Sequence, residues 1–226
     1  MKIFVVFIIL RSTNSIKMGV PIINNYYCVE KISKGAFGEV WKAISKDSYN
    51  TNDNSNKGNE IAIKIEKKER NSQLKNEYAI LSSINPRLNI SPRVFHFGET
   101  PTFNYMVFEL LGQPIDNYYR CACKNISNTD VNISSILKRI GIQMLYCIQS
   151  LHKCGIIHRD IKPQNFLLSN DNTRIYIVDF GISTSYIDHK KHHIPMTYQD
   201  SVIGTIDFIS YYLHEGLSAS RRDDLI

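Results

Sequence analysis

One short span of the chain, from His158 to Asp179, holds a base, a cation and two side chains that favour metal ions. Asp160 can accept the proton of an attacking hydroxyl group, and Lys162 can neutralise a phosphoryl group as it moves. Asn165 and Asp179 can each offer an oxygen atom to Mg²⁺. These side chains together predict phosphoryl transfer to a hydroxyl.

The spacing within this span is its most specific property. His158-Arg159-Asp160, followed by Lys162 and Asn165, places five polar identities at fixed intervals, which chance seldom produces. Asp179-Phe180-Gly181 alone is a common turn tripeptide. Here it follows the apolar run 175–178, which is typical of a strand, so we expect Asp179 at a strand end, facing Asn165 across a metal site.

A second cation and carboxylate precede this span. Lys64 lies in the run 60–66, where Ile61, Ile63 and Ile65 alternate with other residues, a pattern that predicts a strand with Lys64 and Ala62 on one face. Such a lysine can simply extend its stem over apolar surface. Glu77, on the helix expected next, favours instead a pair that directs the ammonium toward the α- and β-phosphates.

A glycine turn lies between the first two expected strands. Gly35 and Gly38 would let backbone amides approach phosphate oxygens, and Phe37 would help to cover them. An ordinary hairpin turn explains the same residues. Ser33 stands where a full glycine loop would have its first glycine.

The surrounding pattern predicts an α+β protein with two lobes. Alternating apolar residues predict a five-stranded antiparallel sheet, and Leu74, Tyr78 and Leu81 recur at helical spacing on one helix that Pro86 ends. Beyond Gly112 the pattern is mainly helical. The expected strands and helices span 27–32, 39–44, 60–66, 72–84, 93–98, 104–110 and 133–153. The expected parts are an extension at 1–25, an N-lobe at 26–111 with a disordered insert at 46–59, and a C-lobe at 112–226.

Composition excludes several classes of protein. The 226 residues include 27 basic and 21 acidic side chains scattered along the chain, which indicates no nucleic-acid-binding face. The five cysteines are odd in number and unpaired in spacing, so we expect reduced thiols. The apolar run 3–10 is far below the roughly 18 residues that span a membrane. Residues 1–17 are expected to be dispensable, since Met18 offers a second start.

These residues carry a resemblance to a known family. From about Tyr26 onward the chain resembles eukaryotic-type protein kinases, and within them the casein kinase I group, including its vaccinia-related branch. Ser210-Tyr211-Tyr212 stands where other kinases have Ala-Pro-Glu. The marks typical of the group are Glu109-Leu110-Leu111-Gly112, Asn165-Phe166-Leu167, His193-Ile194-Pro195, Gly204-Thr205 and Ser220-Arg221-Arg222-Asp223-Asp224.

The resemblance implies a monomeric, cytoplasmic serine/threonine kinase, with the nucleus as a further candidate location. It implies ATP as the phosphoryl donor, Mg²⁺ held by Asn165 and Asp179, Asp160 as the base, and catalytic roles for Lys162, Lys64 and Glu77. Protein serine and threonine hydroxyls would be the acceptors, with no nucleic acid and no membrane insertion. The implied ATP-binding residues are Ile32, Gly35, Phe37, Gly38, Val40, Ala62, Lys64, Phe108, Glu109, Leu111, Leu167 and Val178.

Two acidic residues bear on substrate choice. Kinases of this group tend to bind a phosphate on previously phosphorylated substrates through basic residues, and two of those places here hold Asp200 and Asp207. Carboxylates repel a phosphate, so we expect no preference for such substrates. The nearby His189, His192 and His193 could suggest a metal site, but a solvated basic loop explains them better.

The end of the chain leaves two interpretations open. It stops at Asp224-Leu225-Ile226, where the central helix of the C-lobe begins in the family, so we expect an incomplete C-lobe. One interpretation is an active kinase. The alternative is a truncated, inactive binding or decoy protein that keeps at most nucleotide affinity. A kinase of small metabolites is a third, weaker option.

Overall fold

The computed structural model describes residues 8–12, 15–20, 22–35, 38–45, 60–68, 72–125 and 130–226. It separates into two compact units, one of Met1–Leu74 with Val94–Leu110 and one of Lys75–Arg93 with Leu111–Ile226. The predicted disordered insert at 46–59 and the predicted phosphate-covering Phe37 lie outside the described residues.

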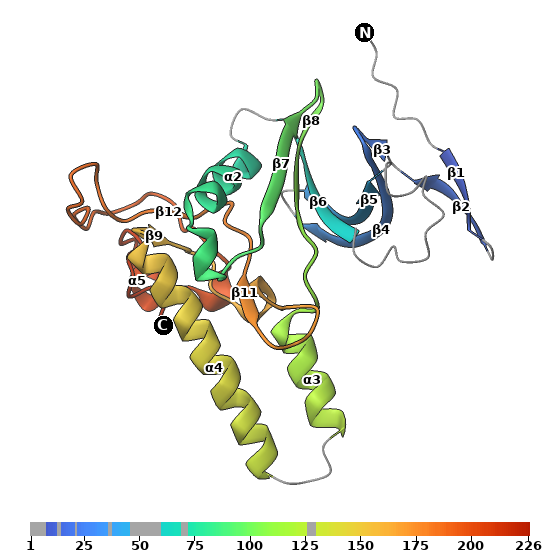
Figure 1. Ribbon diagram of the computed structural model, residues 1–226. Coiled ribbons are helices and arrows are strands. Elements are labelled where there is room, and N and C mark those ends of the chain that lie inside the picture. The colour runs from blue at the N-terminus through green and yellow to red at the C-terminus, as the bar shows by residue number, and fades with distance from the viewer. Residues whose placement is uncertain are drawn as a thin grey trace. The chain divides into compact units, whose positions relative to one another are not determined.

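The first unit contains an antiparallel sheet in the order β3-β4-β5-β6-β8-β7 (Figure 1). All five predicted strands are confirmed. The two-residue strand β3, which the sequence analysis did not predict, pairs with Tyr26 and Tyr27 at one edge. The bounds are β3 Ile22–Ile23, β4 Tyr26–Gly35, β5 Gly38–Ser45, β6 Glu60–Lys67, β7 Val94–Glu99 and β8 Phe103–Glu109.

Two further strands precede this sheet. β1 (Ile8–Ser12) and β2 (Ser15–Val20) pair antiparallel with each other. They fall within the predicted extension at 1–25, for which the sequence analysis assigned no secondary structure.

One face of the sheet forms an apolar core. Cys28, Ala43, Ile63, Tyr105 and Val107 are buried together on it. They alternate along their strands with residues of the opposite face, as the period of two requires. Lys64 and Ala62 therefore share the face opposite Ile63, as the sequence pattern predicted.

A carboxylate from the sheet caps the N-terminus of the helix α2 (Gln73–Ser83). The buried Glu66 accepts hydrogen bonds from the backbone nitrogens of Gln73 (2.9 Å) and Leu74 (3.2 Å), and also from the hydroxyl of Ser72. A carboxylate at a helix N-terminus satisfies free N–H groups and complements the helix dipole. The helix ends before Pro86, as predicted.

The second unit is mainly helical. α4 was predicted at 133–153 and begins three residues earlier than that. Gln143 accepts a hydrogen bond from the backbone of Ile175 and Cys147 donates one to it, so this helix holds the strand that leads to Asp179. The elements are α3 Ile115–Asn125, α4 Asp130–Lys153, β9 Ile156–Ile157, β10 Phe166–Leu168, β11 Ile175–Ile177, β12 Thr184–Ser185 and α5 Tyr211–His214 (Figure 1).

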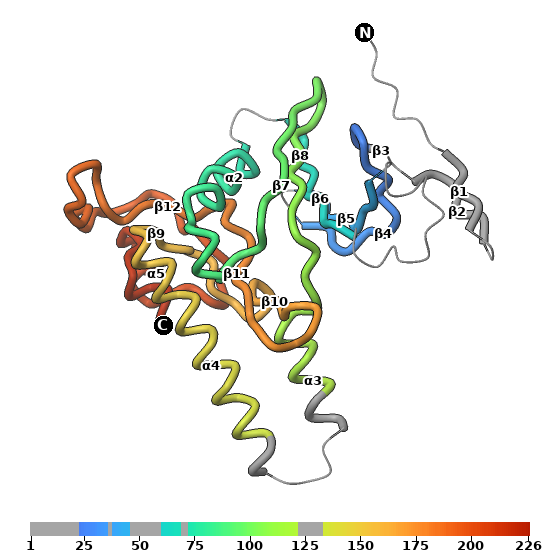
Figure 2. The backbone as a smooth tube through the Cα atoms, viewed as in Figure 1, coloured from blue at the N-terminus to red at the C-terminus, as the bar shows by residue number. Residues whose placement is uncertain are grey.

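Two short strand pairs fix the segments between the helices. β10 pairs antiparallel with β11, and β12 pairs antiparallel with β9 (Figure 2). Because β9 and β10 flank the span from His158 to Asn165, both of its ends are anchored. Among the described residues, no helix combines the length and apolar character needed to cross a membrane.

Candidate active site

The span between β9 and β10 is a tight loop. Arg159 has φ 69°, a left-handed conformation that few residues other than glycine adopt. Pro163 opens a single 3₁₀ turn, Pro163–Asn165, where its fixed φ suits the first position of the turn. This backbone places Asp160, Lys162 and Asn165 together.

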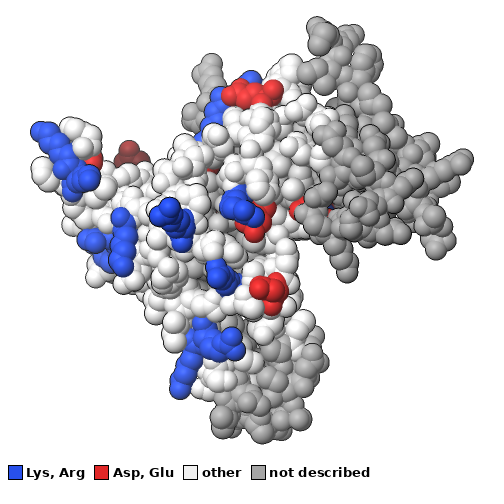
Figure 3. Space-filling view, viewed as in Figure 1, with Lys and Arg blue, Asp and Glu red and all other residues white. Residues whose placement is uncertain are grey.

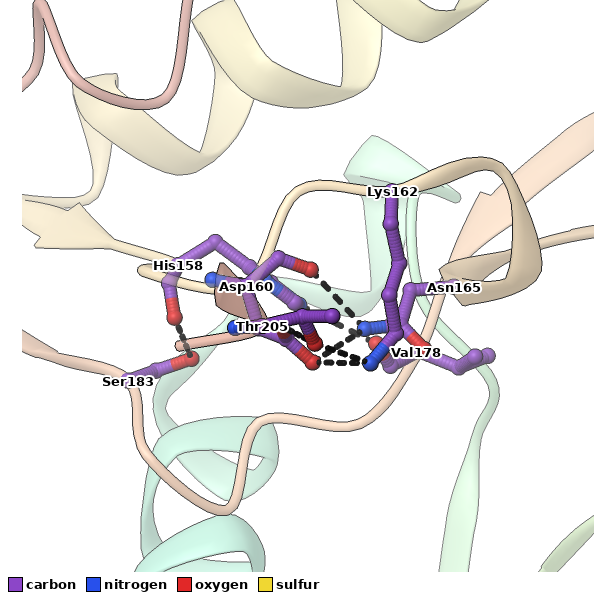
Figure 4. Close-up of polar contacts among 7 residues, drawn as sticks. All are labelled: His158, Asp160, Lys162, Asn165, Val178, Ser183 and Thr205. Carbon is purple, nitrogen blue, oxygen red and sulfur yellow. Dashed lines mark hydrogen bonds and ion pairs between the residues drawn. The ribbon is translucent and has the colours of Figure 1, made fainter. Parts of the chain in front are cut away.

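Asp160 lies at the centre of a polar network (Figure 4). Its Oδ2 accepts hydrogen bonds from Lys162 Nζ at 2.7 Å and from Asn165 Nδ2 at 3.0 Å. Its Oδ1 accepts from the backbone nitrogen of Thr205 at 3.1 Å and from the Thr205 hydroxyl at 2.6 Å. Lys162 Nζ also donates to the Thr205 hydroxyl, at 2.8 Å. The predicted base and cation are therefore in direct contact.

These contacts decide the charge of Asp160. Burial alone would raise the pKa of this carboxyl, but hydrogen bonds from Lys162, Thr205 and Asn165 outweigh the burial and lower its pKa. The group is therefore an ionised carboxylate at every pH above its ordinary pKa of 3.8. An ionised carboxylate can orient a hydroxyl and accept its proton.

Asp224 fixes the backbone on the other side of the loop. Its carboxylate accepts hydrogen bonds from the backbone nitrogens of His158 (2.8 Å) and Arg159 (2.9 Å) and contacts His152 Nε2 at 2.9 Å. Asp224 is 3% exposed, so an unpaired charge there would be costly. The sequence analysis assigned no site role to Asp224 or Thr205. Both residues belong to the sequence marks that carry the family resemblance, and those marks are the one signal that could have identified them.

His158 is fully buried and serves the loop as a neutral ring. Its Nε2 lies 3.0 Å from the carbonyl oxygen of Val178, and its Nδ1 accepts from the backbone nitrogen of Asp160 at 3.3 Å. This pairing requires hydrogen on Nε2 and a lone pair on Nδ1. Burial lowers the pKa of His158 despite the nearby Asp224 and Asp179 carboxylates.

A dependence of stability on pH follows from this ring. Below about pH 6.5 the unfolded chain binds a proton on His158 that the folded chain excludes. The free energy of unfolding should therefore fall as the pH decreases, by at most about 1.4 kcal/mol per pH unit from this group. Urea unfolding, repeated at several pH values, gives the free energy of unfolding as a function of pH. This free energy should depend less steeply on pH for His158→Phe than for the unchanged chain. An equal dependence on pH in both proteins would contradict the neutral, buried ring.

Asp179 and Asn165 have the chemistry that a magnesium site needs. Asp179 follows β11 with φ 68°, and Val178 N donates to Asn165 O at 3.0 Å, so the two segments are neighbours. The amide nitrogen of Asn165 donates hydrogen bonds to Asp160. The amide oxygen of Asn165 is therefore the atom that can bind a cation. Within the described part of the chain, no cluster of three or more His, Cys, Asp or Glu could hold a metal. Two oxygen ligands are what Mg²⁺ usually takes from a protein when phosphates and water supply the rest.

The first unit carries the other predicted nucleotide contacts on one face of its sheet. Val40 pairs with Lys64, and Ala62 pairs with Phe108, in adjacent strands. Directly paired residues point to the same side of an antiparallel sheet. These four predicted contacts therefore share a face, and Glu109 is the last residue of β8.

The glycine turn has a structural reason of its own. Gly35 pairs with Gly38 at the end of the β4–β5 hairpin. A Cβ on Gly38 would lie 2.1 Å from the backbone oxygen of Ile65, and its φ of 149° is rarely adopted by other residues. Gly38 is thus required by close packing on β6, whereas a Cβ on Gly35 would meet nothing within 4 Å. Ile32, near this turn, is half exposed.

The remaining predicted site residues are divided between the units. Lys64 lies in the first unit and the buried Glu77 in the second, and the ion pair between them stays a prediction. Leu111, Leu167 and Val178 also belong to the second unit. Leu167 lies on β10 opposite Tyr176, and the backbone of Gly112 bonds to that of Leu168 at 2.8 Å.

The segment after Asp179 exposes the charged residues noted in the sequence. Asp200 and Asp207 are exposed, and Asp207 is two residues from Thr205, which contacts Asp160. His189, His192 and His193 are exposed on a hairpin, in which the backbone nitrogen of Asp188 donates to the backbone oxygen of His192 at 2.9 Å. Among the described residues on the face seen in Figure 3, the Lys and Arg side chains lie in several separate groups.

Comparisons with known proteins agree on one family. A sequence model of the protein kinase domain matches residues 26–214. The chain is 34% identical over 89% of its length to casein kinase I homolog 2 of Schizosaccharomyces pombe, and 31% identical over 95% to casein kinase I homolog 1 of Saccharomyces cerevisiae. It is 29% identical over 90% of its length to a probable casein kinase I homolog of Encephalitozoon cuniculi. It spans 44%, 38% and 63% of these relatives, respectively.

Proposed function

Because the chain belongs to the protein kinase family, we propose that it transfers the γ-phosphoryl group of ATP to serine and threonine hydroxyls of proteins. The observation that carries this proposal is the ionised Asp160, held in one position by Lys162, Asn165 and Thr205. A binding protein without catalysis has no need of a carboxylate fixed in this way. The similarity to casein kinase I homologues supports the same class.

The residues of the loop divide the chemical work. Asp160 orients the acceptor hydroxyl and takes its proton as the oxygen bonds to phosphorus. Lys162, 2.7 Å from that carboxylate, places a positive charge beside the phosphoryl group as the bond to ADP breaks. Thr205 binds the other carboxylate oxygen, Oδ1, and so fixes the orientation of Asp160. Oδ2 is the oxygen that contacts the Lys162 ammonium.

The metal ion would be held by Asn165 and Asp179. Bound there, Mg²⁺ would neutralise charge on the phosphates of ATP. Since the Asn165 amide nitrogen bonds to both the backbone oxygen (2.9 Å) and a side-chain oxygen (3.0 Å) of Asp160, the metal ligand and the base are positioned by the same contact. In the first unit, Lys64 would direct the α- and β-phosphates.

Phosphoamino-acid analysis tests the class of acceptor. Incubation with Mg-ATP and an acidic protein such as casein should yield phosphoserine and phosphothreonine. In the family that the chain belongs to, a lysine two residues after the base, here Lys162, accompanies serine and threonine acceptors. Phosphotyrosine as the main product would contradict the proposal.

No preference for previously phosphorylated substrates is expected. Asp207 lies two residues from Thr205 and is exposed, so its carboxylate repels a phosphate on the bound substrate. Two peptides that differ only in one phosphoserine near the acceptor should show equal or lower kcat/KM for the phosphorylated one. A strong preference for the phosphorylated peptide would contradict this expectation. Asp207→Lys should shift the ratio toward it.

A further inference from the structure

One side chain of α2 binds three backbone carbonyl groups of a distant turn. Asn76 Nδ2 lies 3.0 Å from the oxygen of Gly181, 3.0 Å from that of Ser183 and 3.4 Å from that of Phe180. Asn76 and this turn belong to the same compact unit. The turn begins immediately after Asp179, one of the two proposed Mg²⁺ ligands.

The turn is held from its other side by the catalytic loop. Arg159 Nε donates a hydrogen bond to the backbone oxygen of Ile182 at 2.6 Å. Among the four carbonyl groups of residues 180–183, this is the one that Asn76 does not contact. The Ser183 hydroxyl donates to the backbone oxygen of His158 at 3.2 Å. Phe180 is fully buried, with its ring 5.2 Å from that of His158. All four carbonyl groups of residues 180–183 are therefore bound, three of them by Asn76.

Packing of α2 does not depend on Asn76. The helix is buried through Leu74, Glu77 and Leu81, whereas Asn76 lies on its exposed side with only its amide directed at the turn. An asparagine there contributes little to the helix itself. Its specific contribution is two N–H donors that converge on carbonyl oxygens, which neither an apolar side chain nor a carboxylate can supply.

We propose that Asn76 is a positioning residue that fixes the Phe180–Ser183 turn against α2 and thereby sets the place of Asp179 for Mg²⁺. The inference rests on the proposed function in one respect, the role of Asp179 as a metal ligand. It adds a link between the helix that carries Glu77 and the segment that carries the metal ligand.

Two substitutions separate the amide from the rest of the helix. Asn76→Leu removes the donors at similar volume, and Asn76→Asp places a carboxylate against the carbonyl oxygens. Ala79→Asp is the matched control, because it adds the same charge at another exposed position of α2. Both Asn76 variants should fold, since the buried residues of α2 are unchanged.

Hydrogen exchange provides a readout that needs no catalysis. Peptides covering residues 180–186 should exchange faster in both Asn76 variants, by about fivefold to tenfold, the factor expected from one lost hydrogen bond. Peptides covering β10 and β11 should not change, and Ala79→Asp should match the unchanged chain. Unchanged exchange in 180–186 would overturn the proposal, and so would a uniform increase across the second unit.

The dependence of ATP binding on Mg²⁺ tests the link to Asp179. In calorimetric titrations, the Mg²⁺ concentration that half-saturates ATP binding should rise about fivefold to tenfold in Asn76→Leu and more in Asn76→Asp. Faster exchange with unchanged Mg²⁺ dependence would make Asn76 merely structural and overturn the proposal. If the unchanged chain binds no Mg-ATP, the proposed function fails, and the exchange result alone then decides whether Asn76 holds the turn.

Discussion

Asp160→Asn should lower the rate of phosphoryl transfer by about 10²- to 10⁴-fold, the range that a positioned general base contributes. An amide cannot accept the proton of the hydroxyl, and it offers Lys162 no negative charge. Binding of Mg-ATP should change little, because the proposed metal ligands and phosphate contacts remain. The measurement is a comparison of kcat and of nucleotide affinity between the variant and the unchanged chain.

A carboxylate outside the site serves as the control. Asp171 is exposed and bonds to its near neighbours Ser169 and Thr173. Asp171→Asn makes the same chemical change there and should leave kcat within about twofold, as surface substitutions usually do. Full activity in a folded Asp160→Asn variant would remove Asp160 from the role of base.

Lys64→Met should reduce kcat/KM by about 10²-fold or more, the loss expected when a preorganised charge on the phosphates is removed. Lys64 lies on β6 with Met106 as its cross-strand partner, so a methionine fits the strand and the unit should stay folded. The loss should appear in steady-state kinetics, while the thermal unfolding transition stays close to that of the unchanged chain.

Lys68→Met is the matched control for this lysine. Lys68 directly follows β6, is exposed, and its ammonium contacts Glu99 at 2.8 Å. An exposed ion pair of this kind contributes about 0–1 kcal/mol to stability and has no place in the proposed chemistry. If Lys68→Met and Lys64→Met reduce activity equally, the effect belongs to the sheet and not to the phosphate contact.

The elements that the sequence predicted well are those with a strong local pattern. The alternation around Ile63 placed Lys64 and Ala62 on one face of a strand, and the register with Phe108 and Met106 confirms that face. The short strand β3 was missed because two residues carry no period. α4 begins at Asp130, three residues before the predicted start, since apolar spacing does not fix the end of a helix to the exact residue.

The parts of the site that spacing could not reveal are contacts between distant segments. Thr205 bonds to Asp160 across 45 positions of sequence, and Asp224 bonds to His158 across 66. Nothing local to those residues distinguishes them from other polar side chains. Gly38 was predicted from its local turn, but its requirement comes from the backbone of Ile65 on the adjacent strand β6 and would hold in a hairpin that bound no phosphate.

The central claim is that the assembled loop around Asp160 transfers phosphate from ATP to a protein hydroxyl. The most direct measurement follows radiolabelled γ-phosphate from ATP onto casein, with the folded chain, with Mg²⁺ present or chelated, and with the Asp160→Asn variant. We predict label on serine and threonine only when both Mg²⁺ and Asp160 are present. A folded chain that transfers no label, or one whose transfer persists in Asp160→Asn, would contradict the claim.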